Sequence, residues 1–537
     1  MDPTTPHSYH EAAMALTLLR LAFLGMVLVL SLANTADDIQ MFKPSLDRLS
    51  LDSDGGNIVY TALMTFYNAT GGPDWNSSDN WGQGSNISSI CTWEGINCSP
   101  VPQSVTGITL LNNNLIGTLP VAISQITSLE ALALTSNSLY GSIPKEIFEM
   151  ATLQTLNVNG NSLTSWPEGV TSCPALEVLF FGENRFTGSI PSFLTHCSLL
   201  TVLNGASNKL TGTIDPAFGS ICRGMKTFNF ASNSLSGTLP ASFANWGPNC
   251  TGIYLSVNLL EGTLPSSWRY FSQLSSLDLQ NNRLEGTLPN EWSEMSSMKQ
   301  FRVDSNNLGG TLPASYSNWT LLTGLGAQNN HLEGTLPPEW SQLSHLDALY
   351  LGYNQLSGTI PSSYEDLIQL RNLIVAANNL HGPLPLFFFS HTSQMGNLDL
   401  SMNQFSGTLP SRHSPSLSSL KLFQNQLEGT IPAGLLTGSL QLFDACANQL
   451  SGTIPSTFAT LNIIEIFAVS DNQLSGTIPV IQPFNSLEKL VYSNNAIEGT
   501  LPTALFLADS DEPTSSLTFL AAENNRLEGT LPVELSG

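Results

Sequence analysis

Charged side chains are scarce in this chain of 537 residues: they make up 11% of it, with only 17 Lys and Arg against 41 Asp and Glu. The formal net charge of −24 at pH 7 should repel nucleic acid and anionic lipid, because both carry dense negative charge. We therefore expect no nucleic-acid partner. Two interpretations of the acidity stay open, an ordinary solvated surface and a surface that collects cations.

The sequence also lacks the motifs that carry catalysis or hold a cofactor. It contains no nucleophile elbow, metalloprotease helix, phosphate-cradling loop or kinase signature. Its eight histidines show no metal-ligand spacing, and a lone histidine such as His331 is better explained as a surface residue. We expect neither an enzyme nor a cofactor nor a metal site.

What the chain has in abundance is one repeated unit, LxxLxLxxNxLxGTLP, shown most clearly at residues 274–292. A period of this length with leucines at these offsets is typical of a leucine-rich-repeat solenoid, in which each unit buries its apolar side only against its neighbours. The repeat therefore favours one elongated domain over the several domains that the length alone suggests. Its Asn recurs eighteen times, mostly 23 to 25 residues apart, at Asn113, Asn137, Asn161, Asn184, Asn208, Asn233, Asn258, Asn282, Asn306, Asn330, Asn354, Asn378, Asn403, Asn425, Asn448, Asn472, Asn495 and Asn525.

The offsets within the unit predict its conformation. Leu277 and Leu279 alternate with Asp278 and Gln280, which indicates a short strand with leucines inward and polar residues outward. Asn282 stands where the chain leaves the strand, and its amide is suited to satisfy backbone groups that the turn leaves unpaired.

Later offsets point to a second strand. Gly286 suits a backbone conformation that a side chain would hinder, and Pro289 stiffens the exit from the next extended piece. Thr follows the glycine in fourteen of the eighteen copies, as a short flanking strand would favour. The predicted fold is an α/β-type solenoid: a right-handed leucine-rich-repeat superhelix with a concave parallel β-sheet, short flanking strands, and short helical or 3-10 convex segments.

An aromatic column lies ten residues after the Asn in eight consecutive units. We interpret it as a stack of offset rings inside the convex side; a ligand-stacking role is the alternative. Its members are Phe218, Phe243, Trp268, Trp292, Tyr316, Trp340, Tyr364 and Phe388.

The N-terminal residues 1–57 precede the repeat. An apolar segment, residues 21–32, follows Arg20 and precedes small residues including Ala33 and Ala36, as in a secretory signal peptide. An uncleaved signal anchor is the alternative for residues 1–36. Residues 37–57 read as a polar, acidic linker. A helix is predicted next, ending at Gly71 and Gly72, with one apolar face formed by Ile58, Ala62, Leu63, Phe66 and Tyr67.

The segment 58–104 continues with Trp75, Trp81 and the stretch CTWEGINC from Cys91 to Cys98. It resembles the N-terminal cap of plant-type extracellular leucine-rich-repeat proteins, which pairs a helix with a CxWxGxxC stretch to cover the first coil. The repeats over residues 105–537, with units such as LEGTLPPEWSQLSHL at 332–346, resemble plant-type receptor-like proteins and the promastigote surface antigens of trypanosomatid protists. This resemblance implies an exported surface or secreted protein and names no ligand.

Cysteine usage agrees with export. Cys173, Cys197 and Cys222 each stand eleven residues before a repeat Asn and so form one column on adjacent coils. Cys446 lies on the outward face of its strand, as a free thiol or an intermolecular partner. For the column, buried inert thiols are the alternative. The disulfides that we predict are Cys91–Cys98 in the resembled cap, Cys173–Cys197 and Cys222–Cys250.

Other surface features are sequons and one loop. The spacing widens to thirty between Asn495 and Asn525, where the run LADSDEPTSS predicts a polar loop. Its acids Asp509, Asp511 and Glu512 lack the other ligands of a calcium loop, so solvation is expected. The chain ends at Gly537 within a repeat and shows no C-terminal cap, so we expect a fragment or a last coil covered by something else. Glycan acceptors are predicted at Asn68, Asn76, Asn86, Asn97, Asn249 and Asn318.

The outward strand positions, four and two residues before each Asn, predict a continuous concave strip. Aromatic residues and Arg are favoured at interface hot spots, so we expect an extended protein or glycan ligand along this strip; ordinary exposed aromatics are the alternative. The function predicted is an exported binding protein, secreted or on the cell surface, acting as receptor ectodomain or adhesion antigen. A structural coat antigen without a ligand is the alternative, and membrane attachment, through the N-terminal segment or a region beyond residue 537, stays open. The candidate ligand-binding residues are Phe180, Tyr254, Asp278, Arg302, Asp304, Tyr350, Asp399 and Lys421.

Overall fold

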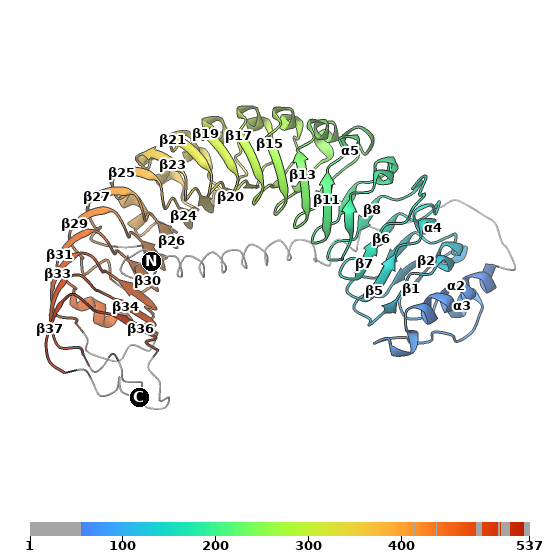
Figure 1. Cartoon of the computed structure of the whole chain (residues 1–537), viewed down its shortest axis with the longest axis horizontal. Helices are drawn as coiled ribbons and strands as arrows, with labels where there is room; N and C mark the ends of the chain where they lie inside the picture. The colour runs from blue at the N-terminus through green and yellow to red at the C-terminus, as the bar shows by residue number, and fades with distance from the viewer. Residues whose placement is uncertain are drawn as a thin grey trace, which may run out of the picture. The chain divides into compact units, whose positions relative to one another are not determined.

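The computed structural model describes residues 55–412, 414–436, 438–479, 486–502, 505 and 516–530. The predicted signal segment, most of the predicted linker and the acidic loop around Asp509, Asp511 and Glu512 lie outside these residues. Within them the chain winds through successive similar coils, and the predicted leucine-rich-repeat solenoid is confirmed (Figure 1). No helix in this described part is long and apolar enough to cross a bilayer.

Each coil contributes one short strand to a long sheet. Leu277 and Leu279 are fully buried, as their alternation with polar residues predicts. Successive strands pair in parallel and in register, as β14 does with β16 and β16 with β18, whereas β1 and β2 form an antiparallel hairpin at the N-terminal edge. The nineteen strands of this sheet among the described residues are β1 (Ile96–Pro100), β2 (Gln103–Thr109), β4 (Ala131–Ala133), β6 (Thr155–Asn157), β8 (Val178–Phe180), β10 (Val202–Asn204), β12 (Thr227–Asn229), β14 (Gly252–Tyr254), β16 (Ser276–Asp278), β18 (Gln300–Arg302), β20 (Gly324–Gly326), β22 (Ala348–Tyr350), β24 (Asn372–Ile374), β26 (Asn397–Asp399), β28 (Ser419–Lys421), β30 (Leu442–Asp444), β32 (Ile466–Ala468), β34 (Lys489–Val491) and β36 (Phe519–Ala521).

A second strand in most coils builds the flanking sheet that the Gly-Thr columns predicted. Gly286 has φ +81°, and a Cβ on it would lie 2.9 Å from Cγ2 of Thr263 in the preceding coil. Glycine is therefore required both for the backbone conformation and for the threonine packed against it. The flanking strands are β3 (Ile116–Gly117), β5 (Ser138–Ser142) and β7 (Ser162–Ser165) in one sheet, and β9 (Thr187–Ser189), β11 (Lys209–Thr213), β13 (Ser234–Thr238), β15 (Leu259–Thr263), β17 (Arg283–Thr287), β19 (Asn307–Thr311), β21 (His331–Thr335), β23 (Gln355–Gly358), β25 (Asn379–Pro383), β27 (Gln404–Thr408), β29 (Gln426–Thr430), β31 (Gln449–Thr453), β33 (Gln473–Gly476), β35 (Ala496–Gly499) and β37 (Arg526–Leu527) in another.

Short helical turns form the convex side, and the aromatic column is packed beneath them. All eight column members are buried, and the rings of Trp268 and Trp292 lie parallel with centroids 6.0 Å apart. The polar atoms of the column rings are hydrogen-bonded as well; Trp292 Nε1, for example, donates to the carbonyl of Pro265 at 2.9 Å. These bonds favour a packing role for the column over ligand stacking. The turns are η3 (Val121–Gln125), α4 (Lys145–Phe148), η4 (Ser192–His196), α5 (Ala217–Ile221), η5 (Ala241–Asn249), η6 (Ser266–Tyr270), η7 (Asn290–Glu294), η8 (Ala314–Asn318), η9 (Pro338–Gln342), η10 (Ser362–Asp366), η11 (Leu386–Phe389) and η12 (Ser456–Thr460).

The N-terminal segment consists of α2 (Gly55–Ala69), η2 (Gly72–Asp74) and α3 (Ile87–Ile90). Helix α2 buries Ala62, Leu63 and Phe66, whereas Ile58, expected on the same face, is 50% exposed one turn before them. The first repeat asparagine ties this segment to the solenoid, because Asn113 Nδ2 donates to the Ser77 carbonyl at 2.8 Å and its Oδ1 accepts from Ser77 N at 2.6 Å.

Among the labelled strands of Figure 1, those of the long sheet, such as β20, β24 and β30, lie along the inner side of the curved coils, and flanking strands such as β21, β25 and β29 lie along the outer rim. The outward side chains of the long sheet therefore line the concave face.

Candidate functional site

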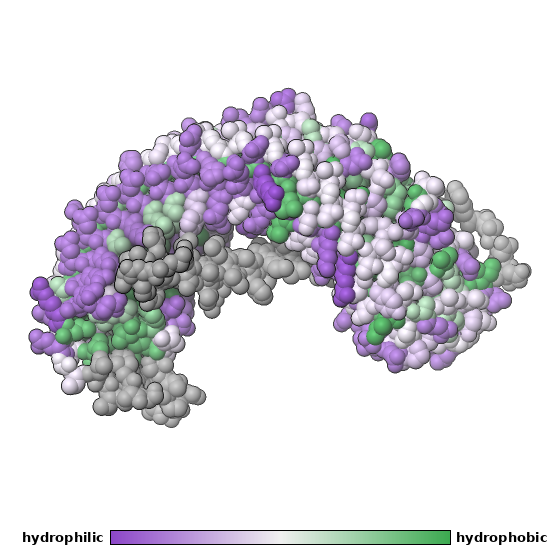
Figure 2. All heavy atoms as spheres, viewed as in Figure 1, coloured by the Kyte–Doolittle hydropathy of each residue, from purple (hydrophilic) through white to green (hydrophobic). Residues whose placement is uncertain are grey.

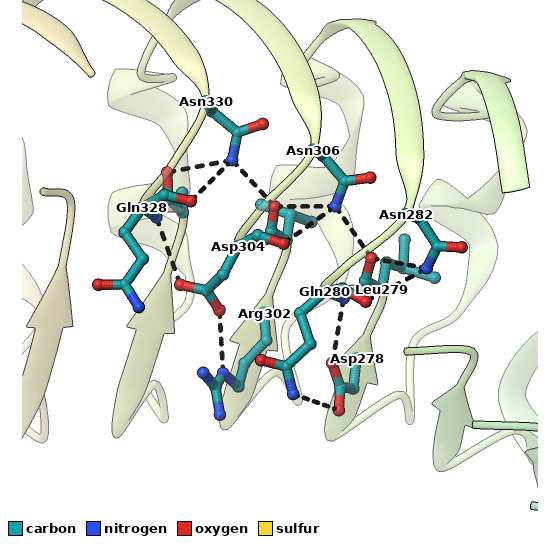
Figure 3. Close-up of polar contacts among 11 residues, drawn as sticks. Asp278, Leu279, Gln280, Asn282, Arg302, Asp304, Asn306, Gln328 and Asn330 are labelled. Carbon is teal, nitrogen blue, oxygen red and sulfur yellow. Dashed lines mark hydrogen bonds and ion pairs between the residues drawn. The ribbon is translucent and has the colours of Figure 1, made fainter. Parts of the chain in front are cut away.

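The concave face rests on a ladder of asparagine amides. Asn306 Nδ2 donates to the carbonyls of Val303 and Asp304 in its own coil, at 3.1 and 3.2 Å, and to Leu279 in the preceding coil at 3.0 Å. Its Oδ1 accepts from Leu284 N at 3.0 Å. The same set of bonds is repeated by Asn282 and Asn330 (Figure 3). Each amide thus pairs the backbone groups at the end of its strand, which fixes where the next outward side chain points.

Strand pairing places the candidate residues in one line across the coils, which we call the concave row. Tyr254 pairs with Asp278 and Asp278 with Arg302; Arg302 pairs with Gly326 and Gly326 with Tyr350. Farther along, Asp399 pairs with Lys421, while Phe180 on β8 lies toward the N-terminal end of the same line. Asp304 is the one candidate outside this row, because it stands two residues beyond β18.

The carboxylates of the row are less available than their outward positions suggested. Asp278 and Asp399 are only 6% and 9% exposed, and each accepts from the backbone N–H two residues on, Gln280 at 3.2 Å and Ser401 at 3.1 Å. Burial raises the pKa of Asp278, and Arg302 opposes the rise. The expectation of solvent-facing carboxylates is therefore wrong for these two residues, because both cap a backbone donor where the strand ends.

Arg302 and Asp304 form an ion pair at the centre of the row. Arg302 Nε lies 3.0 Å from Asp304 Oδ2, and the Asp304 side chain is only 3% exposed. Asp304 Oδ1 also accepts from Gln328 N at 3.3 Å in the next coil. Burial raises the pKa of Asp304 despite Arg302; on Arg302, burial acts against the charge, but Asp304 and Asp278 outweigh it and raise its pKa. Asp304 therefore positions Arg302 and is not itself an accessible contact, which corrects the sequence-based prediction (Figure 3).

Two tyrosines bracket this ion pair, each two coils from Arg302. Burial raises the pKa of both Tyr254 and Tyr350, so both hydroxyls stay protonated at neutral pH. Between Arg302 and Tyr350 stands Gly326, where a Cβ would lie 2.5 Å from Asp304 Oδ2. The Asp304 carboxylate therefore covers this glycine, which is buried. The guanidinium of Arg302 and the ring of Tyr350 stand on either side of it in the row.

Several members of the row were missed by the sequence analysis. Gly326, Ile374 and Asp444 all stand four residues before a repeat Asn, so reading that offset in every unit would have found them. Lys421 Nζ lies 3.8 Å from Asp399 Oδ2, which makes it, like Arg302, a cation paired with an acid of its own chain. Within the described part of the chain no three His, Cys, Asp or Glu side chains come together as a metal site.

The chain is similar to leucine-rich-repeat proteins and to solved receptors. The leucine-rich-repeat family model matches residues 273–295, and no curated protein sequence matches the chain. A solved TDR receptor is 27% identical, with 78% of this chain and 68% of that chain covered and a TM-score of 0.66. The ectodomain of the Arabidopsis thaliana membrane receptor kinase GASSHO1/SCHENGEN3, solved with CASPARIAN STRIP INTEGRITY FACTOR 2, is 28% identical, covers 88% and 65%, and has a TM-score of 0.67. The Arabidopsis receptor kinase HAESA, solved with the peptide hormone IDA and the co-receptor SERK1, is 25% identical, covers 90% and 88%, and has a TM-score of 0.62.

The chain folds as a leucine-rich-repeat solenoid and is similar to the ectodomain of a plant receptor kinase. This leucine-rich-repeat protein contains two disulfides among its described residues, Cys91–Cys98 and Cys173–Cys197, with Cα atoms 5.8 and 5.0 Å apart. One bond lies within the N-terminal segment and the other joins two adjacent coils.

The predicted Cys222–Cys250 disulfide is wrong, because both residues are buried free thiols. Trp246 of the next coil packs against α5, where its Nε1 donates to the Phe218 carbonyl at 3.1 Å. Cys250 follows the kink at Gly247 in η5 and stands eight rather than eleven residues before its repeat Asn, so it lies outside the cysteine column. Burial raises the pKa of Cys222 to about 11 and that of Cys250 to about 12.

Cys446 is also free, but its predicted outward exposure is wrong. The residue is 8% exposed, and its Sγ accepts from Ser470 N in the next coil at 3.2 Å. Burial raises the pKa of this thiol as well. An intermolecular disulfide through Cys446 would require its strand to separate from the next coil.

The six sequon asparagines of the leucine-rich-repeat protein are all exposed. Asn249 and Asn318 end the convex turns η5 and η8, away from the concave row. The other four lie in the N-terminal segment, where Asn86 Oδ1 also caps α3 through Ser89 N at 2.9 Å. Asn97 Nδ2 donates to Thr109 Oγ1 at 3.3 Å, so a glycan at Asn97 would lie at the N-terminal end of the concave face. Glycans at Asn249 and Asn318 would leave the concave row uncovered.

Proposed function

We propose that this chain is an exported binding protein that holds an extended peptide segment along the concave row, centred on the stretch from Tyr254 to Tyr350. The observation that carries the proposal is the arrangement around Arg302: a guanidinium fixed by Asp304, no side chain at Gly326 in the next coil, and a tyrosine two coils away on each side. Arg and Tyr are the residues that most often dominate binding energy at interfaces.

The dimensions of the row favour an extended ligand. Neighbouring parallel strands stand roughly 4.8 Å apart, so the four steps from Tyr254 to Tyr350 span roughly 19 Å. An extended chain covers this distance in about six residues. The phenol hydroxyls and the free edge of Arg302 offer hydrogen-bond donors at intervals along such a chain, which suits its backbone carbonyls.

Similar proteins support a peptide as the ligand class. HAESA was solved with a peptide hormone and a co-receptor, and the receptor RGFR1 with RGF2. The proposal includes export of the chain and glycosylation at the six acceptors. Its two disulfides are of the kind that persists in oxidising compartments, which supports export.

The test is a peptide selection on the purified protein. A random library of about twelve-residue peptides is selected on the immobilised chain, and the enriched peptides are titrated against wild type and the triple variant Tyr254→Ala, Arg302→Ala, Tyr350→Ala. Losing these three side chains should weaken binding at least about a hundredfold, because each hot-spot residue contributes about 1 kcal/mol or more.

The matched control removes the same residue types from other faces: Tyr140→Ala, Tyr270→Ala and Arg269→Ala. Both tyrosines are about half exposed, so binding and thermal unfolding should stay unchanged. Enriched peptides that bind the first triple variant as well as wild type would show that the concave row is not the site. Failure to enrich any peptide would favour the structural coat antigen instead.

A further inference from the structure

The regular stacking of the convex side is interrupted between η10 and η11, where a cavity of about 350 Å³ opens. Leu367, Phe387 and Phe388 form its apolar floor beside the exposed Ile368. Its rim is polar, with Glu365 on one side and Ser390, Thr392, Ser393 and Gln394 on the other. This volume falls within the range of roughly 300–1,000 Å³ typical of ligand pockets. The cavity faces away from the concave row, so the proposed function does not use it.

The sequence explains why the cavity forms here. In the two preceding coils a leucine, Leu343 or Leu367, follows the column aromatic by three residues and is buried. In this coil that position is His391, which is exposed, and Phe389 is buried instead. The repeat is also one residue longer than its predecessor, since Asn378 to Asn403 spans twenty-five residues. The chain after η11 therefore bulges away from η10.

The rim is built by hydrogen bonds of the bulge itself. The hydroxyls of Ser390 and Thr392 lie 3.1 Å apart, Ser393 Oγ accepts from Met395 N at 3.1 Å, and Ser414 Oγ donates to the Ser393 carbonyl at 2.7 Å. Gln394 Oε1 accepts from Arg371 Nη2 at 3.2 Å. Because the rim is fixed by these contacts, the cavity is preformed.

Large apolar side chains are unusually exposed at this place. Ile368 lines the cavity and is 64% exposed, and Leu386, beside Phe387, is also 64% exposed. The outer rim of the C-terminal half is otherwise largely hydrophilic, with isolated apolar patches (Figure 2). Exposed apolar groups next to a cavity mark an interaction site more often than scattered ones do. No sequon follows Asn318 in the sequence, so no predicted glycan is attached to the coils that form the cavity.

The charge on the convex turns near the cavity is negative. The convex turns from η7 to η11 contain Glu291, Glu294, Glu339, Glu365 and Asp366 but no Lys or Arg. The nearest cation at the rim, Arg371, is held by Asp347 at 3.0 Å. A partner that approaches this side is favoured if it carries positive charge.

We propose that the η10–η11 cavity is a second interaction site, which takes one large apolar side chain from a protein partner whose flanking residues are basic. The apolar side chain fills the floor against Ile368 and Phe387, and a neighbouring Lys or Arg meets Glu365. The contact area is small, so the interaction is weak and transient on its own and adds to binding elsewhere on the partner.

The test uses acetylated tripeptides with a central 4-fluorophenylalanine, flanked by two lysines or by two glutamates, followed by ¹⁹F NMR titration against the full chain. The lysine peptide should bind with a dissociation constant of about 1 mM or below and lose at least about tenfold affinity in Ile368→Ser. The glutamate peptide should bind at least about tenfold more weakly than the lysine peptide, and Glu365→Gln should narrow that difference. Because Ile368 is 64% exposed, its replacement should leave thermal unfolding unchanged.

Two control variants test whether the lysine peptide binds at the cavity and not elsewhere. Ile463→Ser removes another exposed isoleucine, 40% exposed, and should leave lysine-peptide affinity unchanged. The triple variant of the concave row should also bind the lysine peptide normally, whatever the outcome of the peptide selection. Equal affinity for wild type and Ile368→Ser, or equal affinity for both peptides, would overturn the proposal.

Discussion

The amide of Asn306 donates a hydrogen bond of 3.0 Å to the carbonyl of Leu279, twenty-seven residues earlier in the chain. This single contact bridges two coils, and the same amide closes the end of its own strand. The ladder therefore contributes both to the shape of each coil and to its attachment to the preceding coil.

Replacing Asn306 by Leu should loosen the solenoid locally. The change keeps the side-chain volume similar but leaves backbone groups such as Leu284 N and the Leu279 carbonyl short of a partner, at a cost of roughly 1–3 kcal/mol. Hydrogen exchange should report faster exchange between residues 282 and 330. Asn307→Leu is the control, because Asn307 is exposed and bonds only to His331. Equal protection in the two variants would argue against the ladder.

Peptide mapping without reduction should find Cys91 linked to Cys98 and Cys173 linked to Cys197, with Cys222, Cys250 and Cys446 as free thiols. The free thiols should resist alkylation at pH 8 until the chain is unfolded, since all three are buried and burial raises the pKa of each. Rapid labelling of Cys446 in the folded protein would contradict its burial against Ser470. A Cys222–Cys250 peptide would contradict the position of Trp246.

Tyr316→Phe should test whether the aromatic column is stabilised by hydrogen bonds as well as by packing. The hydroxyl donates to the Pro289 carbonyl at 3.1 Å, and the ring is fully buried. Its removal should lower the free energy of unfolding by about 0.5–1.5 kcal/mol, measured by urea denaturation. Tyr270→Phe, at a site 56% exposed, should change it little. If the two variants have the same free energy of unfolding, the column stabilises the coils by packing alone.

Asp278→Asn should stabilise the protein at neutral pH by up to about 1 kcal/mol. The folded-state pKa of Asp278 is raised by burial even with Arg302 nearby, so ionisation is less favourable in the folded than in the unfolded chain. Stability should therefore fall in wild type as pH rises above about 4, the unfolded value, and this loss should be absent from the variant. Below that pH the two proteins should unfold alike.

The matched comparison for this prediction is Asp278→Ala, which cannot accept from Gln280 N. It should be less stable than Asp278→Asn at every pH, since Asn already fills this capping role at Asn204 and Asn229. If the difference in melting temperature between wild type and Asp278→Asn is the same at pH 3 and pH 7, the buried charge is not the cause of that difference.

The repeat made most of the fold predictable. A strand whose leucines alternate with polar residues has only one way to face the core, and eighteen copies at a near-constant period determine the stacking. Of the eight residues that the same offsets proposed as contacts, seven belong to the concave row. The direction in which a side chain points depends on its own strand, however, whereas the exposure of that side chain depends also on the coils beside it. Arg302 of the next coil stands beside Asp278, which the pattern of one coil alone did not reveal.

The remaining differences arise where the period changes. Cys250, which follows the kink at Gly247, does not pair with Cys222, and the extra residue between Asn378 and Asn403 accompanies the η10–η11 cavity. Insertions of one residue were visible in the sequence, but their effect depends on which side chain fills the displaced position. Trp246 and Phe389 fill these positions, and the repeat pattern predicts neither residue.

Every asparagine from Asn137 onward bonds to the preceding coil in the same way, and Asn113 makes its bonds to Ser77 instead. Removing or duplicating one whole repeat would therefore recreate each inter-coil bond with an equivalent partner. Unequal recombination between repeats of the gene should accordingly yield chains of different length that still fold. Because each coil adds roughly 4.8 Å, such events would move Tyr254 and Tyr350 apart or together in fixed steps, so that the length of peptide accommodated changes by whole increments rather than continuously.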